Sequence, residues 1–426
     1  MLKKLIDRFR SSEFLVNVSK LTTGTAIAQL ISIGTAPILY RIYDKVHYGT
    51  LGLYMAITGV VGVFSTMQYL QTILLEKDDE GAINAMWLNR IINTCFALLS
   101  LLVIVLLFPF IVKWVNNPTL NKWLWFIPVS IFFAGQNEIF RIWANRKKEY
   151  NLLTFNAIFM AILTPIISIG LGLLLQNETG LFVGLIVGQS LPALLLLFGL
   201  RKKYNLGLQS VTFKRIKELA REHRQFPIYS LPQSFIGQYA NSIPVFMLNS
   251  FVGAGAVGDY NLAIRMLGLP IQFIGGAITS VFSQEATKRF NTYGTYKELF
   301  LKTFKSLALI SIIPVIILTL FSTEIFTLIF SEKFRTAGVI AGFMAPMFAL
   351  KLINSPLSYG FYIHKLLKLD LLITVVVCAG AYIIFSVSFK NGQDYLEVLK
   401  FYTLFISLIY LFNLMVNFNL SRKMGM

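Results

Sequence analysis

The sequence contains few charged residues. Asp, Glu, Lys and Arg make up 14% of the 426 residues, against roughly a quarter in a soluble globular domain. Hydrophobic residues account for 56%, and the mean hydropathy is +0.67. This balance excludes a soluble enzyme or binding domain. The chain is therefore predicted to be an all-α integral membrane protein whose core is a bundle of membrane-spanning helices.

Cysteine and histidine are also scarce. The two cysteines, Cys95 and Cys378, both lie in apolar stretches, so we expect two free, buried thiols and no disulfide framework. The three histidines, His47, His223 and His364, do not have the spacing of metal ligands. We therefore expect neither a metal nor a cofactor.

Acidic residues are outnumbered by basic ones. The chain has 20 Asp and Glu against 38 Lys and Arg, which gives a net charge of +18. In a soluble protein such an excess would suggest nucleic acid. In a membrane protein it has a plainer cause, since cytoplasmic loops are enriched in Lys and Arg. We therefore expect membrane lipids as partners and no nucleic acid.

Twelve apolar stretches are long enough to cross a bilayer, which takes about 20 residues. They lie near 15–40, 47–72, 88–112, 123–143, 151–175, 180–200, 226–250, 257–282, 302–321, 338–362, 368–389 and 396–420. The segment that precedes them, residues 1–10, is basic and amphipathic. No small-residue cleavage site follows a short apolar region there, so we expect the first span to stay in the mature protein.

The distribution of Lys and Arg predicts the orientation. If the N-terminus is cytoplasmic, the inner segments hold 27 of the 38 basic residues and the outer loops hold 7. The other four, Lys20, Arg265, Lys351 and Lys400, lie within spans. Both termini are therefore predicted to be cytoplasmic.

The longest connection, residues 201–225, divides the spans into six and six. We therefore predict an N-terminal lobe over residues 1–200 and a C-terminal lobe over residues 226–426. Within the connection, Phe213, Ile216, Leu219 and Ala220 share one face of a basic amphipathic helix. That pattern predicts an interfacial helix on anionic lipid. A docking site for a cytoplasmic partner is the alternative.

Polar side chains interrupt several spans at three- and four-residue steps. The amides among them include Gln29, Gln68, Gln233, Asn241 and Asn354. Such stripes either line a polar path or form hydrogen bonds between helices, which are modest in a membrane. Deep charges carry more information, because a charge inside a bilayer is costly and usually functional. Those charges are Glu138, Arg141, Arg265 and Lys351.

Residues 226–290 resemble a known family. In order they contain Phe226-Pro227, Pro244-x3-Leu248-x4-Gly253, Gly258-x-Tyr260-x-Leu262-Ala263-x-Arg265, Leu269-Pro270-x3-Ile274-Gly275 and Val281-Phe282-x-Gln284-x-Ala286. This stretch is similar to the Wzx-type oligosaccharide flippases, the polysaccharide-biosynthesis branch of the MOP exporter superfamily. Asp259 and Ser283 depart from the pattern, since apolar or aromatic residues are usual there.

The resemblance implies a MATE-like fold, with two six-helix lobes around a cationic central cavity that opens alternately to either side. It implies a transporter of the bacterial plasma (inner) membrane and not an enzyme. The implied substrate is an oligosaccharide repeat unit on undecaprenyl pyrophosphate, moved to the outer leaflet for O-antigen or capsule assembly. A polysaccharide polymerase and glycosyltransferases are the implied protein partners.

A pyrophosphate needs cationic partners, and arginine can bind its oxygens bidentately. Arg265 and Lys351 are the main candidates, at roughly 10 and 20 Å from the outer ends of their spans. Neither span supplies an acid at the depth of its cation, although snorkelling and a structural partner remain the alternatives. Arg41 is a weaker candidate because Asp44 could pair with it. The polar stripes, with Gln29, Gln68, Gln233, Asn241 and Asn354, would contact the sugars.

If a proton or sodium ion drives transport, an acid must change its charge or occupancy. Asp259 and Glu138 are the candidates for this coupling. The alternatives are a solvated corner for Asp259 and an ion pair with Arg141 for Glu138.

Two other functions remain open. A MATE-like, cation-coupled exporter of small molecules should have a lone carboxylate in the middle of a span and an acidic cavity, and the first and seventh spans contain no such residue. A membrane glycosyltransferase or polymerase should have a catalytic acidic pair or a large outer loop, and the sequence has neither.

Overall fold

The computed structural model describes residues 13–204, 206 and 211–422, apart from the side chains of 13–22 and 277. The basic segment 1–12 and residues 207–210 of the predicted connection lie outside the described residues. Helices and the short turns between them account for the described ranges, in which no strand occurs. The predicted all-α class is therefore confirmed.

The chain folds as two compact units, Met1–Gln238 and Tyr239–Met426. The boundary lies within a helix, α11, and not in the connection 201–225. The first unit contains α2 (Glu13–Ile42), α3 (Lys45–Gly62), η1 (Val63–Thr66), η2 (Tyr69–Gln71), α4 (Thr72–Leu75), α5 (Asp79–Val115), η3 (Pro118–Leu120), α6 (Asn121–Leu124), α7 (Ile127–Arg146), α8 (Tyr150–Leu175), α9 (Thr179–Lys203), α10 (Phe213–Glu222), η5 (Phe226–Ser230) and the start of α11 (Leu231–Phe251).

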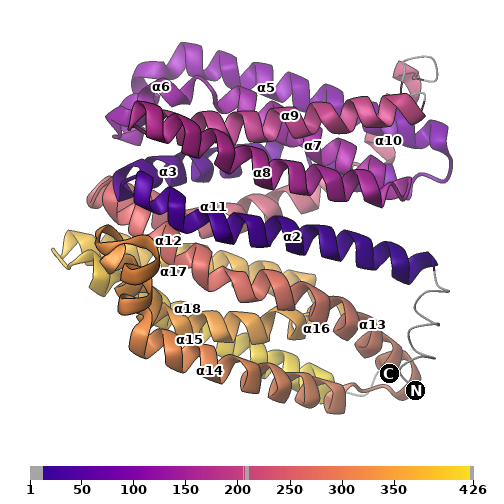
Figure 1. The fold of residues 1–426 in the computed structure, drawn as a ribbon. Helices are drawn as coiled ribbons and strands as arrows, with labels where there is room; N and C mark the ends of the chain where they lie inside the picture. Colours follow the sequence, from indigo (N-terminus) through magenta and orange to yellow (C-terminus); the bar gives the residue numbers. More distant parts are fainter. Residues whose placement is uncertain (1–12, 205, 207–210, 423–426) are drawn as a thin grey trace. The chain divides into compact units, whose positions relative to one another are not determined.

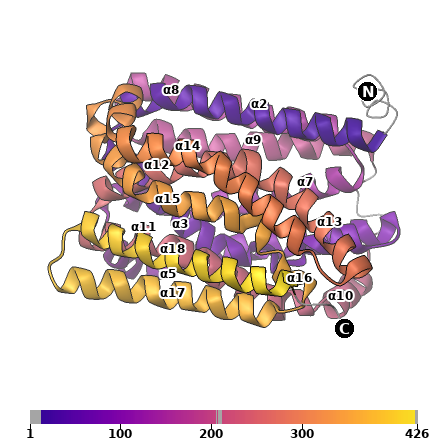
Figure 2. The same cartoon turned by 90° about the horizontal axis from the view of Figure 1, so that it is seen from below.

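The second unit continues from α11. It contains α12 (Ala254–Pro270), η6 (Ile271–Gly275), α13 (Gly276–Tyr293), α14 (Lys297–Phe330), η7 (Glu332–Phe334), α15 (Arg335–Leu357), α16 (Gly360–Ile363), α17 (Leu367–Lys390) and α18 (Tyr395–Arg422). Within this unit α17 and α18 lie side by side (Figure 2). The segment η6 is π-helical and follows Pro270. A proline and a π-helical turn are both common causes of a bend in a helix.

Each predicted span contains a helix. In the part of the chain that the structure describes, nine helices are long and apolar enough to cross a membrane, or ten if the bent pair α12–α13 counts as one span. Helices α7 and α11 have 20 and 21 residues but are more polar. Their polarity comes from amide and charged side chains, and these side chains also make the two helices candidates for function.

Glycines allow α8 and α9 to pack closely (Figure 1). A Cβ atom at Gly180 would collide with the hydroxyl group of Tyr43, and one at Gly184 would collide with that of Ser168. A Cβ atom at Gly188 would meet the hydroxyl group of Thr164. This stripe of small residues is therefore structural, as close helix packing in membranes requires.

Helix α10 buries two residues of its apolar face against protein. Ile216 and Leu219 are buried in a cluster with side chains of α5, α7 and α9, and the backbone carbonyl of Ala220 accepts a hydrogen bond from Tyr69. Only Phe213, of the apolar face, is largely exposed. The prediction that this face lies on lipid is therefore wrong, because helical periodicity identifies an apolar face without identifying what covers it.

Candidate functional site

The candidate site residues are divided between the two units. Gln29, Arg41, Gln68, Glu138 and Gln233 belong to the first unit, and Asn241, Asp259, Arg265, Lys351 and Asn354 belong to the second. Arg41 and Asn241 are exposed, and Gln29 and Gln233 are partly buried. None of these four lines the cavity described next.

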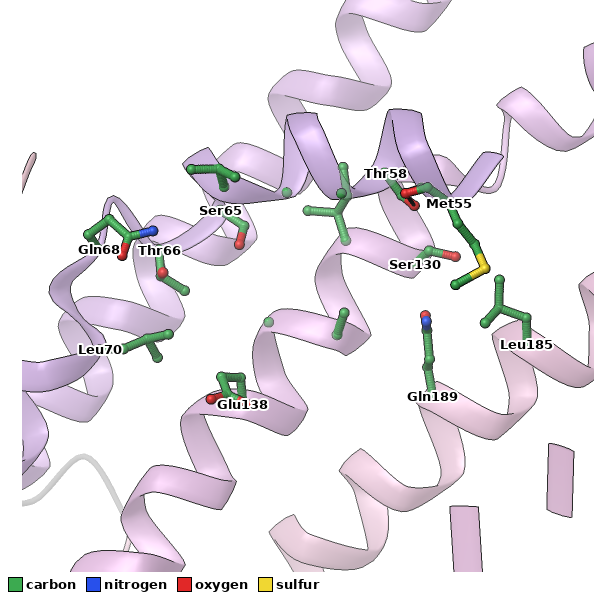
Figure 3. A pocket seen from close by; sticks show the side chains of 16 residues that line it. Met55, Thr58, Ser65, Thr66, Gln68, Leu70, Ser130, Glu138, Leu185 and Gln189 are labelled. Carbon is green, nitrogen blue, oxygen red and sulfur yellow. Dashed lines mark hydrogen bonds between the residues drawn. The ribbon is translucent and has the colours of Figure 1, made fainter. Parts of the chain in front are cut away.

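The first unit contains a cavity of about 420 Å³ between α3, α7 and α9 (Figure 3). Sixteen residues line it: Met55, Thr58, Gly59, Gly62, Val63, Ser65, Thr66, Gln68, Leu70, Ser130, Ile131, Ala134, Gly135, Glu138, Leu185 and Gln189. Its volume is in the range of small-molecule sites, roughly 300–1,000 Å³. The structure thus brings together two predicted site residues, Gln68 and Glu138.

The second predicted span is broken beside this cavity. Helix α3 ends at Gly62 and continues as two 3₁₀ segments, between which Met67 has φ 49° and Gln68 has φ 62°. Two successive non-glycine residues in the left-handed region are unusual and cost about 1–3 kcal/mol each. The sequence predicts one continuous span here, because the break itself falls on neither glycine nor proline.

The polar side chains in the wall of the cavity are nearly all uncharged: Thr58, Ser65, Thr66, Gln68, Ser130 and Gln189. The hydroxyl groups of Tyr54 and Ser130 are hydrogen-bonded 2.6 Å apart, and Thr58 donates to the backbone carbonyl of Tyr54 at 2.9 Å. The Oε1 atom of Gln189 is buried and has no hydrogen-bond partner in the described part of the chain. A buried acceptor without a partner is costly, so this atom is suited to a ligand or a water molecule. Nothing in the sequence distinguishes Gln189 from the other polar residues of the spans.

Glu138 is already paired in the observed state. Arg141 donates from Nε to one carboxylate oxygen at 2.8 Å and from Nη2 to the other at 2.7 Å. This is the bidentate geometry of a strong charge-assisted pair. It favours the ion-pair interpretation of Glu138 over the coupling interpretation.

A third charge of the first unit, Arg90, is one that the sequence reasoning missed. Its Nε donates to Gln136 at 3.1 Å, and its guanidinium carbon lies 4.3 Å from the ring centroid of Trp87 and 5.4 Å from that of Phe140. An amide and two aromatic faces thus stabilise this cation. It was missed because its position near the inner end of a span fits the rule for cytoplasmic loops.

Two cations of the second unit, Arg265 and Lys351, were predicted from the sequence. Arg265 lies on α12 and is exposed at the surface of the unit, and Lys351 lies on α15, which packs against α12. The Nζ of Lys351 lies 5.4 Å from the ring centroid of Phe348. No carboxylate within residues 13–204, 206 and 211–422 forms an ion pair with either cation. One turn beyond Lys351, the Oδ1 atom of Asn354 is buried without a hydrogen-bond partner among those ranges.

Asp259 is buried and not solvated. It lies near the start of α12 with 1% of its surface exposed, and its carboxylate interacts electrostatically with Tyr395. The interpretation as a solvated corner residue is therefore wrong. The corner itself is formed by Gly253, whose φ of 113° is unfavourable for other residues.

One group of potential metal ligands is found among the described residues. Oxygen or nitrogen atoms of Glu76, Glu222 and His223 lie within 4.8 Å of one another. Arg215 donates to Glu76 at 3.1 Å and to Glu222 at 3.3 Å. A guanidinium therefore provides the positive charge that these carboxylates need, and the cluster fastens α10 to the segment before α5.

This chain is similar in sequence to known proteins of polysaccharide biosynthesis. A family described as "Polysaccharide biosynthesis protein" matches residues 38–338. The teichuronic acid biosynthesis protein TuaB of Bacillus subtilis (strain 168) is 28% identical over 131 residues, which is 31% of this chain and 27% of TuaB. The lipopolysaccharide biosynthesis protein WzxC of Escherichia coli (strain K12) is 21% identical over 343 residues, which is 78% of this chain and 67% of WzxC. The chain thus matches only about a quarter of TuaB's length.

Solved structures share the fold. The lipid II flippase MurJ, in an inward closed conformation, aligns with a TM-score of 0.69 over 93% of this chain and 89% of MurJ, at 16% identity. A multidrug resistance MATE family transporter of the MOP superfamily, in an inward-facing conformation, aligns with a TM-score of 0.66 over 93% of this chain and 97% of that chain, also at 16% identity. The predicted MATE-like fold is therefore confirmed.

Proposed function

The chain belongs to the polysaccharide biosynthesis protein family, and from this premise we propose that it is a lipid-linked oligosaccharide flippase. The proposed substrate is an oligosaccharide repeat unit on undecaprenyl pyrophosphate. The protein moves it from the cytoplasmic to the outer leaflet of the bacterial plasma membrane, where O-antigen or capsule is assembled. Glycosyltransferases would supply this substrate and a polymerase would consume the product.

The observation that supports this proposal most is the pair of cations in the second unit. Arg265 and Lys351 lie on two helices that pack together, and neither forms an ion pair with a described residue. A cation in a membrane-spanning helix is costly, and one without an acid partner is costlier still. A pyrophosphate ligand supplies the missing negative charge, since arginine and lysine both bind phosphate oxygens.

Transport then follows from alternating exposure of these groups to the two sides of the membrane. Arg265 and Lys351 hold the pyrophosphate while the isoprenoid chain stays in the bilayer. The charged head group therefore does not enter the hydrocarbon core without cationic partners. Asp259 is the candidate for coupling to a proton or sodium ion, because a buried carboxylate changes its charge only when the local environment changes.

An exporter of cationic small molecules is the second candidate. The likeness to a MATE family transporter and the buried carboxylate of Asp259 favour it. It does not account for Arg265 and Lys351, whose charges would repel a cationic substrate.

Reconstitution distinguishes the two functions. The purified protein is placed in liposomes that contain a fluorescent undecaprenyl-pyrophosphate-linked saccharide, and the outer-leaflet fluorophore is quenched chemically. The protein should expose the whole lipid pool to the quencher and should not accumulate the cationic dye ethidium. Accumulation of ethidium without movement of the lipid would contradict the proposal and establish the exporter.

We also propose that both termini are cytoplasmic, on the basis of the distribution of basic residues. In a background with Cys95→Ser and Cys378→Ser, Asn177→Cys and Asn391→Cys should react with an impermeant thiol reagent in intact cells. Lys214→Cys, on the exposed face of α10, should react only after the cells are opened. The reverse pattern would overturn the orientation.

A further inference from the structure

We propose that the cavity of the first unit is a saccharide subsite, which binds uncharged sugar rings of the transported lipid. This inference rests on the proposed flippase function and deepens it, because it assigns recognition of the sugars to a place different from Arg265 and Lys351. Four observations carry it: the charge of the cavity, its unused hydrogen-bonding groups, its space and its strained wall.

The charge of the lining is compensated. Glu138 is the one ionisable residue among the sixteen that line the cavity, and its carboxylate is held bidentately by Arg141. A pyrophosphate therefore meets no net positive charge here, and a cationic drug meets no free carboxylate. An uncharged polyhydroxylated ligand is the class that such a surface favours.

The cavity has hydrogen-bonding capacity that the protein itself does not use. Gln189 has a buried Oε1 atom that accepts no hydrogen bond from the described residues, and neither Gln68 nor Ser65 forms a hydrogen bond with another described side chain. Gln189 lies near Ser130 and Met55, whereas Gln68 lies at the other end beside Ser65 and Thr66 (Figure 3). An amide both donates and accepts, as a sugar hydroxyl does. Two separated amides can therefore bind hydroxyl groups at two points of one ligand.

Gly62 provides space in the cavity. A Cβ atom at Gly62 would have no heavy atom within 4 Å, so this position faces open volume and not a packed neighbour. Gly59, one turn earlier on α3, also lines the cavity, but a Cβ atom there would lie 2.7 Å from the amide nitrogen of Gln238. A larger side chain at Gly62 would therefore fill volume that a sugar ring requires.

The strained wall is the part that positions Gln68. Met67 and Gln68 both have left-handed backbone angles, which ordinary residues adopt only when the surrounding structure imposes them. A regular continuation of α3 would turn the Gln68 side chain in another direction. Backbone strain of this kind is concentrated at ligand sites, and here it lies in the segment that carries one of the two amides.

The test compares two lipids that share the pyrophosphate. Purified protein in detergent is offered an equimolar mixture of bare undecaprenyl pyrophosphate and the polyprenyl-linked saccharides extracted from cells that lack the gene. The bound lipids are quantified by mass spectrometry. Three proteins are compared with the wild type: the double variant Gln68→Ala/Gln189→Ala, Gly62→Leu, and the control Gly34→Leu. Gly34 also faces open space but does not line the cavity.

The wild type and Gly34→Leu should enrich the saccharide-bearing lipid over the bare lipid by about tenfold or more. Two ordinary hydrogen bonds to the sugars are enough to produce a preference of this size. The double variant and Gly62→Leu, if monodisperse in gel filtration, should bind the two lipids in nearly equal amounts. Undiminished enrichment in both variants would overturn the subsite, as would equal binding by the wild type. Binding of neither lipid by the wild type would instead overturn the flippase function on which the subsite rests.

Discussion

Two sites of this protein, one in each unit, differ in how their charged side chains are paired. In the first unit the carboxylate of Glu138 is held bidentately by Arg141, and the cavity that it lines is otherwise uncharged. In the second unit Arg265 and Lys351 form no ion pair with a described residue. A folded chain can leave a charge without a partner in a membrane only at a cost. The proposed function explains the difference by two binding tasks, with neutral sugars assigned to one unit and an anion to the other.

The largest effect should come from removing the cations of the second unit. Arg265→Ala and Lys351→Ala should abolish surface-glycan export, because truncating one partner of a desolvated charged contact costs roughly 2–5 kcal/mol, at least about 30-fold. Arg265→Lys should restore export only in part, since an ammonium loses the bidentate geometry. Export is measured as surface glycan at equal membrane levels of each variant.

Lys400→Ala is the matched control. Lys400 is an exposed cation of the same unit, as Arg265 is, but it lies near the start of α18, where its side chain can reach the interface. Its loss should leave export unchanged. Full export by both Arg265→Ala and Lys351→Ala would remove the pyrophosphate site from the account.

A smaller effect separates the two carboxylates. Asp259→Asn should slow transport by about tenfold, because the buried group can no longer change its charge, whereas Glu138→Gln should reduce it less. Rates are measured in liposomes with and without an imposed proton or sodium gradient. Normal gradient-driven transport by the Asp259→Asn/Glu138→Gln double variant would exclude both residues from coupling.

The packing of α10 predicts that a substitution can lower stability without touching the cavity of the first unit or the cations of the second. Leu219→Ala should destabilise the first unit by roughly 2–5 kcal/mol, as expected for a fully buried leucine. Phe213→Ala, on the same helix but 79% exposed, should change stability by less than about 0.5 kcal/mol. Thermal unfolding in detergent measures both, and equal effects would show that α10 does not pack as described.

The smallest effect concerns pH. Hydrogen bonds from Lys203 and Tyr204 hold the pKa of Glu149 below its ordinary value. The stability that this carboxylate contributes is therefore present above the unfolded pKa and is lost as the pH falls through the lower, folded pKa. Glu149→Gln should flatten the fall in melting temperature at acidic pH. An unchanged acid limb in the variant would rule out this contribution.

The sequence predicted the helices well because a bilayer imposes length and hydropathy on every span. It also identified Gln68 and Glu138, which line one cavity, since polar side chains are rare in spans and therefore conspicuous. Asp259 was identified as a candidate, but its burial was not, because position at the end of a span says nothing about what packs over it.

What the sequence could not predict depends on neighbours from distant segments. The break at Met67 lacks the glycine or proline that would signal it. The Oε1 of Gln189, which has no hydrogen-bond partner among the described residues, is recognisable only once α3, α7 and α9 are placed around it. Arg90 resembles an ordinary cytoplasmic cation until Gln136 and Trp87 are seen beside it. These features arise from packing and not from local pattern.

The most direct test of the account measures the affinity of purified protein for bare undecaprenyl pyrophosphate, which has no sugars to contact the first unit. The double variant Arg265→Ala/Lys351→Ala should bind this lipid at least about 30-fold more weakly than the wild type, which is the effect of losing even one charged contact worth about 2 kcal/mol. Lys400→Ala should bind it as the wild type does. Equal affinity of the double variant and the wild type would contradict the claim that the cations of the second unit hold the pyrophosphate.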